Sequence, residues 1–134
     1  MIYITYKTFF SAAHSLYNKK MGRLKNKNIY GKCAGKYPHG HNYELKVTLR
    51  GDADPITGML VNLDTVKKIV NKNVIQKLDH QDFNRLSFIK NIVPTSENLC
   101  KIVWDILAKT KLKDYLFEIR LDETDSNSIA LRNG

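Results

Sequence analysis

The segment from His39 to Leu49 is the part of the sequence that most constrains the fold. Beyond residue 42 its side chains alternate in the manner of a strand, so that successive side chains point to opposite faces. His39 and His41 therefore point the same way. Gly40 between them has no side chain, so another group can approach the backbone closely on the opposite face of the strand. Two adjacent imidazoles make half of a zinc site, because a catalytic zinc takes three protein ligands and keeps one open position.

A third histidine ends the first predicted strand. Residues 1–12 are rich in β-branched and aromatic side chains, which indicates a strand, and His14 follows it closely. A histidine in this setting is either a packed core residue or a ligand. If this strand pairs with the one that carries His39 and His41, His14 can complete three nitrogens on one metal ion. Taken alone, the His-x-His pair also fits two surface histidines on an edge strand.

Length and composition indicate one domain that covers residues 1–134. A hydrophobic content of 43% and a charged content of 26% are those of an ordinary soluble globule. Lys7 and His14 interrupt the apolar N-terminal stretch, and no apolar run approaches the length of a membrane span. We therefore expect a cytoplasmic protein with no membrane partner, in which Cys33 and Cys100 are free thiols.

The formal net charge of +9 raises the question of an anionic partner. The basic residues are scattered and often interleaved with Asn, as in residues 18–20 and 25–28, and no RNP-like or helix-turn-helix pattern accompanies them. We therefore expect no nucleic-acid partner, and a solvated basic surface is the simplest interpretation. Such a field can also attract a small polyanion such as a phosphate ester into a cleft.

The remaining patterns predict an α+β domain. Residues 15–32 lack clear periodicity and should form a long loop with one helical turn, and residues 59–61 should end a short strand. Amphipathic helices should begin near Asn62 and near Thr95, and residues 115–131 should form a hairpin. This order predicts a four-stranded antiparallel sheet with two helices on one face.

Two further polar positions allow either a structural or a chemical interpretation. Asp79 and His80 follow the first predicted helix, where each can turn toward a different partner. They could be a capping Asp and a solvent His, or His80 could carry protons if it meets Cys33. Glu123 ends a strand beside an acidic turn. It could serve solubility alone, or hold a ring with several N–H donors, because one carboxylate accepts two parallel hydrogen bonds.

Six spaced motifs resemble those of the 6-pyruvoyltetrahydropterin synthase family, in order over nearly the whole chain. They are residues 10–16, 31–33 with 39–43, 54–59, 78–80, 96–98 with 104–105, and 123–127. Six motifs at these spacings are highly specific. The resemblance implies a pterin synthase domain over residues 1–134 with the tunnelling fold, in which trimers close their sheets into a barrel and two trimers stack as a homohexamer.

The resemblance also implies a lyase that converts 7,8-dihydroneopterin triphosphate to 6-pyruvoyltetrahydropterin and eliminates triphosphate, in tetrahydrobiopterin biosynthesis. The resemblance implies that Zn²⁺ is bound by His14, His39 and His41. It implies a proton-transfer set of Cys33, Asp79 and His80. It also implies that Glu123 anchors the pterin ring, with help from Thr95, Ser96 or Glu97. The basic surface would then attract the triphosphate, with Lys32, Lys36 and the loop lysines as candidates.

Three alternatives stay open at this point. Cys33 as a fourth zinc ligand would close the site and make it structural. A related enzyme, 6-carboxytetrahydropterin synthase of the queuosine route, shares the zinc site and the substrate. The five residues between Cys33 and His39, with the motifs at residues 54–58 and 123–127, favour the pyruvoyl product. The third alternative is a non-enzymatic basic binding module that kept the fold. In such a module the Cys, Asp and His of the proton-transfer set would have no chemical role.

Overall fold

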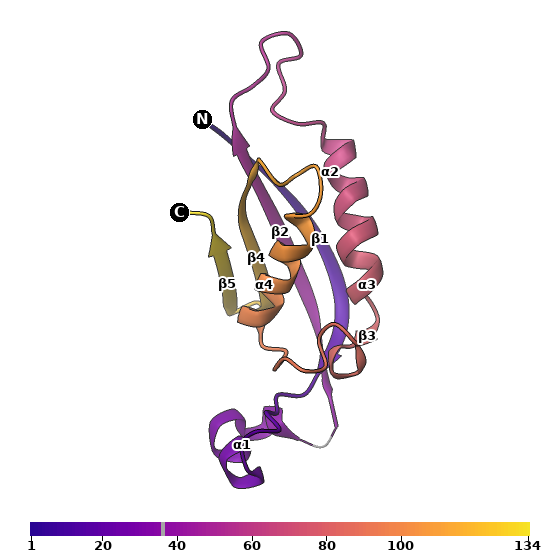
Figure 1. The fold of residues 1–134 in the computed structure, drawn as a ribbon, viewed down its shortest axis with the longest axis vertical. Coiled ribbons are helices and arrows are strands. Elements are labelled where there is room, and N and C mark those ends of the chain that lie inside the picture. Colours follow the sequence, from indigo (N-terminus) through magenta and orange to yellow (C-terminus); the bar gives the residue numbers. More distant parts are fainter. Residues whose placement is uncertain (36) are drawn as a thin grey trace.

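The computed structural model describes residues 1–35 and 37–134, and a long pair of strands forms its centre (Figure 1). Strands β1 (Ile2–His14) and β2 (His39–Gly51) pair antiparallel along thirteen residue pairs. The register runs from Ile2 opposite Gly51 to His14 opposite His39. The pair therefore brings residues 14 and 39 together at the end of the molecule that carries α1.

The sheet has five strands in the order β3-β1-β2-β4-β5. Strand β4 (Leu116–Thr124) pairs antiparallel with β2 and with β5 (Asn127–Arg132), whereas β3 (Gln81–Asp82) pairs in parallel with β1. The expected four-stranded antiparallel sheet was therefore wrong in the number of strands and in the direction of one. A two-residue strand is too short to leave a periodic pattern in the sequence. Residues 59–61, expected to end a strand, adopt loop conformation.

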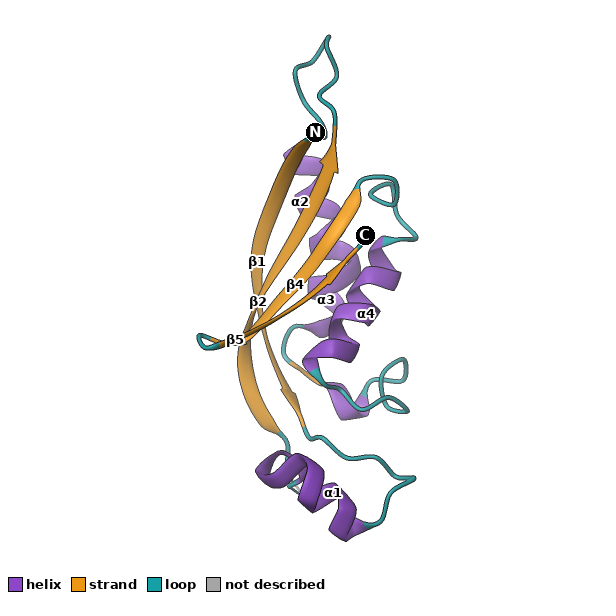
Figure 2. Ribbon diagram, turned by 90° about the vertical axis from the view of Figure 1, so that its left-hand side faces the viewer, coloured by secondary structure: helices purple, strands orange, loops and turns teal. Residues whose placement is uncertain are grey.

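Two helical segments cover one face of the sheet, as the sequence predicted (Figure 2). In chain order the helical elements are α1 (Arg23–Tyr30), η1 (Gly31–Ala34), α2 (Leu63–Val70), η2 (Asn71–Ile75), α3 (Gln76–Leu78), η3 (Phe83–Arg85) and α4 (Ser96–Leu107). The π-helical η2 joins α2 and α3 into one continuous segment, which covers the sheet together with α4. Among the helices described, none combines the length and apolar character needed to cross a bilayer.

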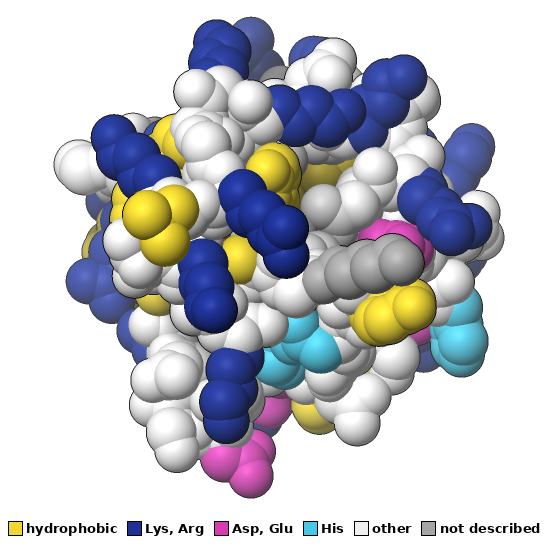
Figure 3. Space-filling view, turned by 90° about the horizontal axis from the view of Figure 1, so that it is seen from below, with side chains coloured by type: hydrophobic (Ala, Val, Ile, Leu, Met, Phe, Trp, Pro, Cys, Tyr) yellow, Lys and Arg dark blue, Asp and Glu magenta, His cyan; other side chains and the backbone are white. Residues whose placement is uncertain are grey.

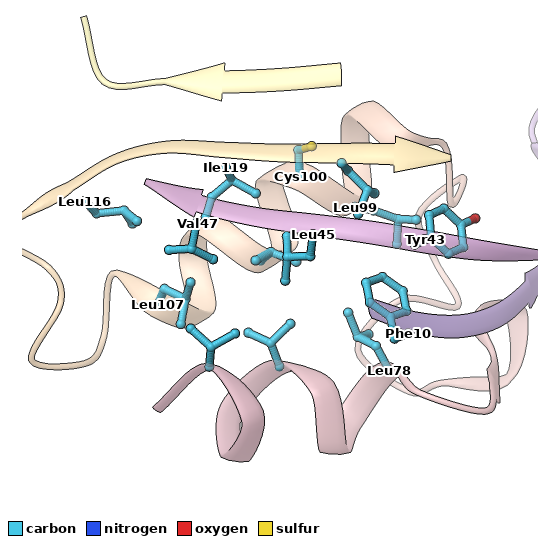
Figure 4. Packing of buried hydrophobic residues seen from close by; sticks show 14 of the residues in the cluster. Phe10, Tyr43, Leu45, Val47, Leu78, Leu99, Cys100, Leu107, Leu116 and Ile119 are labelled. Atoms are coloured by element: carbon cyan, nitrogen blue, oxygen red, sulfur yellow. The ribbon is translucent and has the colours of Figure 1, made fainter. Parts of the chain in front are cut away.

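The helices meet the sheet through one apolar core (Figure 4). Val66, Val70, Val74 and Leu78 recur every fourth residue along α2, η2 and α3, and all are buried because this spacing places them on one helix face. Side chains alternate along a strand, so the face of β2 that buries Leu45 in this core also carries the two histidines of that strand. The core and the histidines therefore lie on the same side of the sheet.

The segment at residues 15–32, predicted as a loop with one helical turn, contains the two-turn helix α1. Its anchor is Asn26, whose side chain is completely buried. The Asn26 Oδ1 accepts a hydrogen bond from the Asn18 amide at 2.8 Å. The Asn26 Nδ2 lies 3.0–3.1 Å from three backbone carbonyls, those of Asn18, Met21 and Gly22. A helix held by one buried polar side chain lacks the apolar stripe that would have predicted it.

We expect Asn26→Ala to loosen α1 and the Cys33 segment, because three carbonyls and one amide lose a buried partner. Unsatisfied buried polar groups cost about 1–3 kcal/mol, so the free energy of local opening at residues 18–30 should fall by about that amount. Amide hydrogen exchange measures this change. Asn28→Ala, at an exposed position of the same helix, is the matched control. Unchanged exchange in Asn26→Ala would contradict the anchoring role.

Candidate functional site

Strand register gathers three histidines at one end of the sheet. His14 lies opposite His39, and the ring of His41 faces the same side. The ring centroids are 4.6 Å apart for His14 and His39, 4.9 Å for His39 and His41, and 5.1 Å for His14 and His41. Glu123, near the end of β4, completes the cluster, and one ligand atom from each of the four residues lies within 4.8 Å of the others. We call these four residues the His–Glu cluster.

The hydrogen bonds of His14 leave one ring nitrogen free for a ligand. Its Nδ1 lies 2.7 Å from the Pro94 carbonyl oxygen. A carbonyl only accepts, so Nδ1 carries the proton and Nε2 keeps its lone pair. The Nε2 atoms of His14 and His41 are buried, and neither makes a hydrogen bond within the described residues. The Glu123 Oε1 atom lies 3.4 Å from His14 Nε2 and 2.9 Å from His41 Nε2, but neither contact has the geometry of a hydrogen bond.

The electrostatics of this cluster favour neutral imidazoles. Burial lowers the pKa values of His14 and His41. The Pro94 carbonyl and the Glu123 carboxylate oppose this effect only in part at His14, and Glu123 does so at His41. Neutral imidazole is the form that binds metal ions, and a metal-binding histidine commonly donates its other N–H to a carbonyl, as His14 does to Pro94. Three imidazole nitrogens are a donor set that fits a divalent metal ion, and the Glu123 carboxylate lies next to them.

Glu123 also contacts the start of α4. Its Oε2 accepts a hydrogen bond from the Ser96 hydroxyl at 2.9 Å, and Ser96 is buried. Thr95 instead caps α4 by accepting from the Asn98 amide, and Glu97 is exposed. Of the three helpers suggested for Glu123, Ser96 is therefore the one in contact with it among the described hydrogen bonds.

Cys33 does not belong to the His–Glu cluster. It is half-buried in η1, and its sulfur is not among the four clustered ligand atoms. Its carbonyl accepts a hydrogen bond from the Leu16 amide at 2.7 Å, which ties η1 to the segment that follows His14. The structure therefore places a carboxylate, and not this thiol, beside the three histidines.

Asp79 and His80 contact each other, whereas the sequence also allowed each of them to turn toward a different partner. The Asp79 Oδ2 lies 3.0 Å from His80 Nδ1, and its Oδ1 accepts from the Ser11 amide at 2.9 Å. The positive φ of 59° at His80 is a backbone conformation that the sequence did not reveal. The Ser11 amide, with a smaller effect of His80, lowers the pKa of Asp79, which is therefore ionised and orients the ring.

The His80 ring is not part of the His–Glu cluster, although it lines a hollow that the cluster residue His41 also lines. It is 83% exposed, and the open hollow has a volume of about 440 Å³. Gly40 and Asn42, which line this hollow too, alternate with the histidines of β2 and lie on the face of the sheet that points away from the helices. In the described part of one chain, no hydrogen bond or ion pair joins Cys33 to His80.

Sequence reasoning missed the Pro94 carbonyl, which fixes the tautomer of His14. A backbone carbonyl carries no residue-specific signal, and Pro94 and His14 are eighty positions apart. Only the fold could reveal this contact. Lys36, a predicted phosphate contact, lies outside the described residues.

Comparisons with known proteins agree on one family. The family model described as 6-pyruvoyl tetrahydropterin synthase matches residues 3–134. The chain is 40% identical over 131 residues to a 6-pyruvoyl tetrahydrobiopterin synthase of Poecilia reticulata, which covers 97% of this chain and 89% of that one. It is 36% identical over 124 residues to the Homo sapiens protein of the same name, with 92% and 86% covered. The solved Caenorhabditis elegans 6-pyruvoyl tetrahydropterin synthase matches at a TM-score of 0.95 and 32% identity, with 99% and 96% covered.

We expect Zn²⁺ or Co²⁺ to raise the melting temperature, because a ligand that binds only the folded state stabilises it. At a hundred times the Kd the gain is about 2.7 kcal/mol. His14→Ala should abolish the shift, and His80→Ala, a histidine outside the His–Glu cluster, should preserve it. Differential scanning calorimetry of metal-free and metal-loaded protein measures both. An equal shift in the parent and His14→Ala would show that the metal binds elsewhere.

Proposed function

The chain belongs to the 6-pyruvoyl tetrahydropterin synthase family, and we propose that it is a zinc-dependent lyase that converts 7,8-dihydroneopterin triphosphate to 6-pyruvoyltetrahydropterin. The reaction eliminates triphosphate and serves tetrahydrobiopterin biosynthesis. The observation that carries the proposal is the His–Glu cluster, in which buried imidazole nitrogens without hydrogen bonds lie beside a carboxylate.

His14, His39 and His41 would hold the zinc ion. Zn²⁺ favours imidazole nitrogen, and three neutral ligands preserve its full double charge. A zinc ion held there would supply Lewis acidity, which would make the C–H and O–H groups of a substrate side chain more acidic. The Pro94 carbonyl would keep the His14 ring in the tautomer that this role requires.

Cys33, Asp79 and His80 would move the protons. The Cys33 thiolate would remove a proton from the substrate side chain, and His80 would exchange protons with it. Asp79 holds the Nδ1 side of the His80 ring and would leave Nε2 available for this exchange. Because no hydrogen bond or ion pair joins Cys33 to His80 in the described part of one chain, we infer that the complete site forms between two chains.

Glu123 would anchor the pterin ring. A carboxylate can accept two parallel hydrogen bonds from the N–H groups of such a ring. Ser96 would act as a positioning residue, because its hydroxyl fixes one carboxylate oxygen at 2.9 Å. Since Glu123 lies within 4.8 Å of the histidine ligand atoms, a ring held there would carry its side chain to the metal.

The oligomer we propose is a hexamer made of two trimers, with the sheets of each trimer closed into a barrel. The support is that β5 ends the sheet on one side, while β1 pairs with β3 only at residues 12 and 13 on the other. Open strand edges favour pairing with another chain. Ile2, Tyr3 and Phe9 near the β1 edge are 43%, 53% and 65% exposed, which also suits a covered surface.

We assign residues 1–134 to one pterin synthase domain and place the enzyme in the cytoplasm. The family match over residues 3–134 supports the first assignment. Two free thiols, Cys33 and Cys100, suit a reducing compartment and support the second.

The reaction product tests the activity directly. Zinc-loaded protein incubated with 7,8-dihydroneopterin triphosphate should release triphosphate and yield a pterin with a three-carbon dicarbonyl side chain, measured by mass spectrometry. A carboxylated pterin with released acetaldehyde would instead identify a 6-carboxytetrahydropterin synthase. Absence of conversion by protein with verified bound zinc would favour a binding module and contradict the enzyme.

Cys33→Ala should keep zinc and lose turnover, because the thiol acts on the substrate and not on the metal. Loss of a general base typically lowers kcat by about 100-fold or more. Metal analysis and kcat measure the two effects. Cys100→Ala is the matched control, since burial raises the pKa of the Cys100 thiol to about 12 and keeps it protonated. Loss of zinc from Cys33→Ala would overturn this assignment in favour of a structural site.

A further inference from the structure

A basic cleft lies at the α1 end of the molecule, and residues that adjoin His14 and His39 in the chain help to line it. It has a volume of about 810 Å³. Four cationic side chains line it: Arg23 and Lys27 from α1, Lys32 from η1 and Arg85 from η3, against one acid, Asp82. Figure 3 shows this end of the molecule, where Lys and Arg side chains spread around a histidine.

The positive charge of the cleft is largely uncompensated. The first 43 residues of the chain contain eight Lys and Arg and no Asp or Glu. Within the described residues, Arg23, Lys27 and Lys32 form no ion pair, whereas Arg85 Nε lies 3.6 Å from Asp82 Oδ2. Unpaired cations in a concave surface concentrate field and attract a multiply charged anion.

Hydrogen bonds hold the walls of this cleft together. Arg23, Asn26 and Lys27 share one face of α1, because they are spaced three and four residues apart, and buried Asn26 fixes that helix. Asn84 of η3 accepts from the Ser15 amide at 2.8 Å and donates to the Ser15 carbonyl at 2.9 Å. The Ser15 hydroxyl donates to the Gly35 carbonyl at 2.8 Å. The cationic side chains therefore project from connected segments.

The cleft is lined by residues that directly flank the proposed zinc ligands and Cys33 in the chain. Ser15 follows His14, Pro38 precedes His39, and Lys32 and Ala34 flank Cys33; all four of these flanking residues line the cleft. A substrate whose reacting carbons lie at the His–Glu cluster and Cys33 would extend its far end into this space.

We propose that this cleft binds a linear polyphosphate, as the triphosphate group of the substrate or as the released inorganic triphosphate. The assignment rests on the proposed function for the identity of the substrate, and on the four cations for the phosphate site itself. Arg23 and Lys27 bind from α1, and Lys32 and Arg85 bind from η1 and η3. Arginine matches phosphate oxygens in pairs, and lysine acts as a point charge.

Binding of inorganic triphosphate to the zinc-loaded protein, measured by isothermal titration calorimetry, tests the phosphate site without turnover. Lys27→Gln and Arg85→Gln should each weaken binding about tenfold, the loss expected when one hydrogen bond to a charged group is removed. Raising the salt concentration should weaken binding to the parent. Lys25→Gln is the matched control, because Lys25 is an exposed residue of α1 that does not line the cleft. It should change the Kd less than twofold.

Two further measurements separate this inference from the proposed activity. Phosphate-free dihydroneopterin should bind the parent and the cleft variants equally, and the cleft variants should raise KM for the triphosphate substrate. Three results would overturn the cleft assignment and leave the proposed activity intact. These are no binding of inorganic triphosphate, a loss of triphosphate affinity in Lys25→Gln equal to that in the cleft variants, and an unchanged KM of the cleft variants during normal turnover. Triphosphate binding that depends on Lys27 and Arg85, without any conversion of substrate, would uphold the cleft and reject the activity.

Discussion

The hydrogen-bond register between β1 and β2 is the constraint on which the rest of the structure depends. Side chains alternate along a strand, so a slip of one residue would move His14 to the opposite face from His39 and His41. The same slip would expose Phe10 and Ala12, which are buried in the core. The apolar residues that require burial thus also fix the positions of the histidines, and the stability of the core protects the geometry of the site.

The start of α4 connects this sheet to the site through three consecutive residues. The Pro94 carbonyl accepts from His14, Thr95 caps the helix, and the Ser96 hydroxyl donates to Glu123. A helix N-terminus is rigid when its amides are capped, so the contacts on either side of Thr95 are held in place. Burial of His14 is tolerated because its Nδ1 has this partner, while its Nε2 remains for a ligand.

Three different spaces meet at this end of the molecule. The His–Glu cluster continues the apolar face, the Asp79–His80 pair lies by a hollow on the other face, and the basic cleft lies under α1. The His–Glu cluster supplies metal-binding nitrogens, the Asp79–His80 pair can exchange protons, and the basic cleft supplies positive charge. In the binding mode that we propose, the ring and the reactive side chain of the substrate lie at the His–Glu cluster, and its polyanionic tail lies in the basic cleft.

The sequence by itself determined the strands around His14 and His39, the helices that begin near Asn62 and Thr95, and the family. These follow from local patterns, namely alternation, apolar spacing, capping residues and motif order. Only the tertiary structure decided the position of α1, the parallel pairing of β3, and the contacts of Asp79 with His80 and of Ser96 with Glu123. These features depend on backbone geometry or on polar contacts, most of them between residues far apart in the chain, and such contacts leave no periodic trace in the sequence.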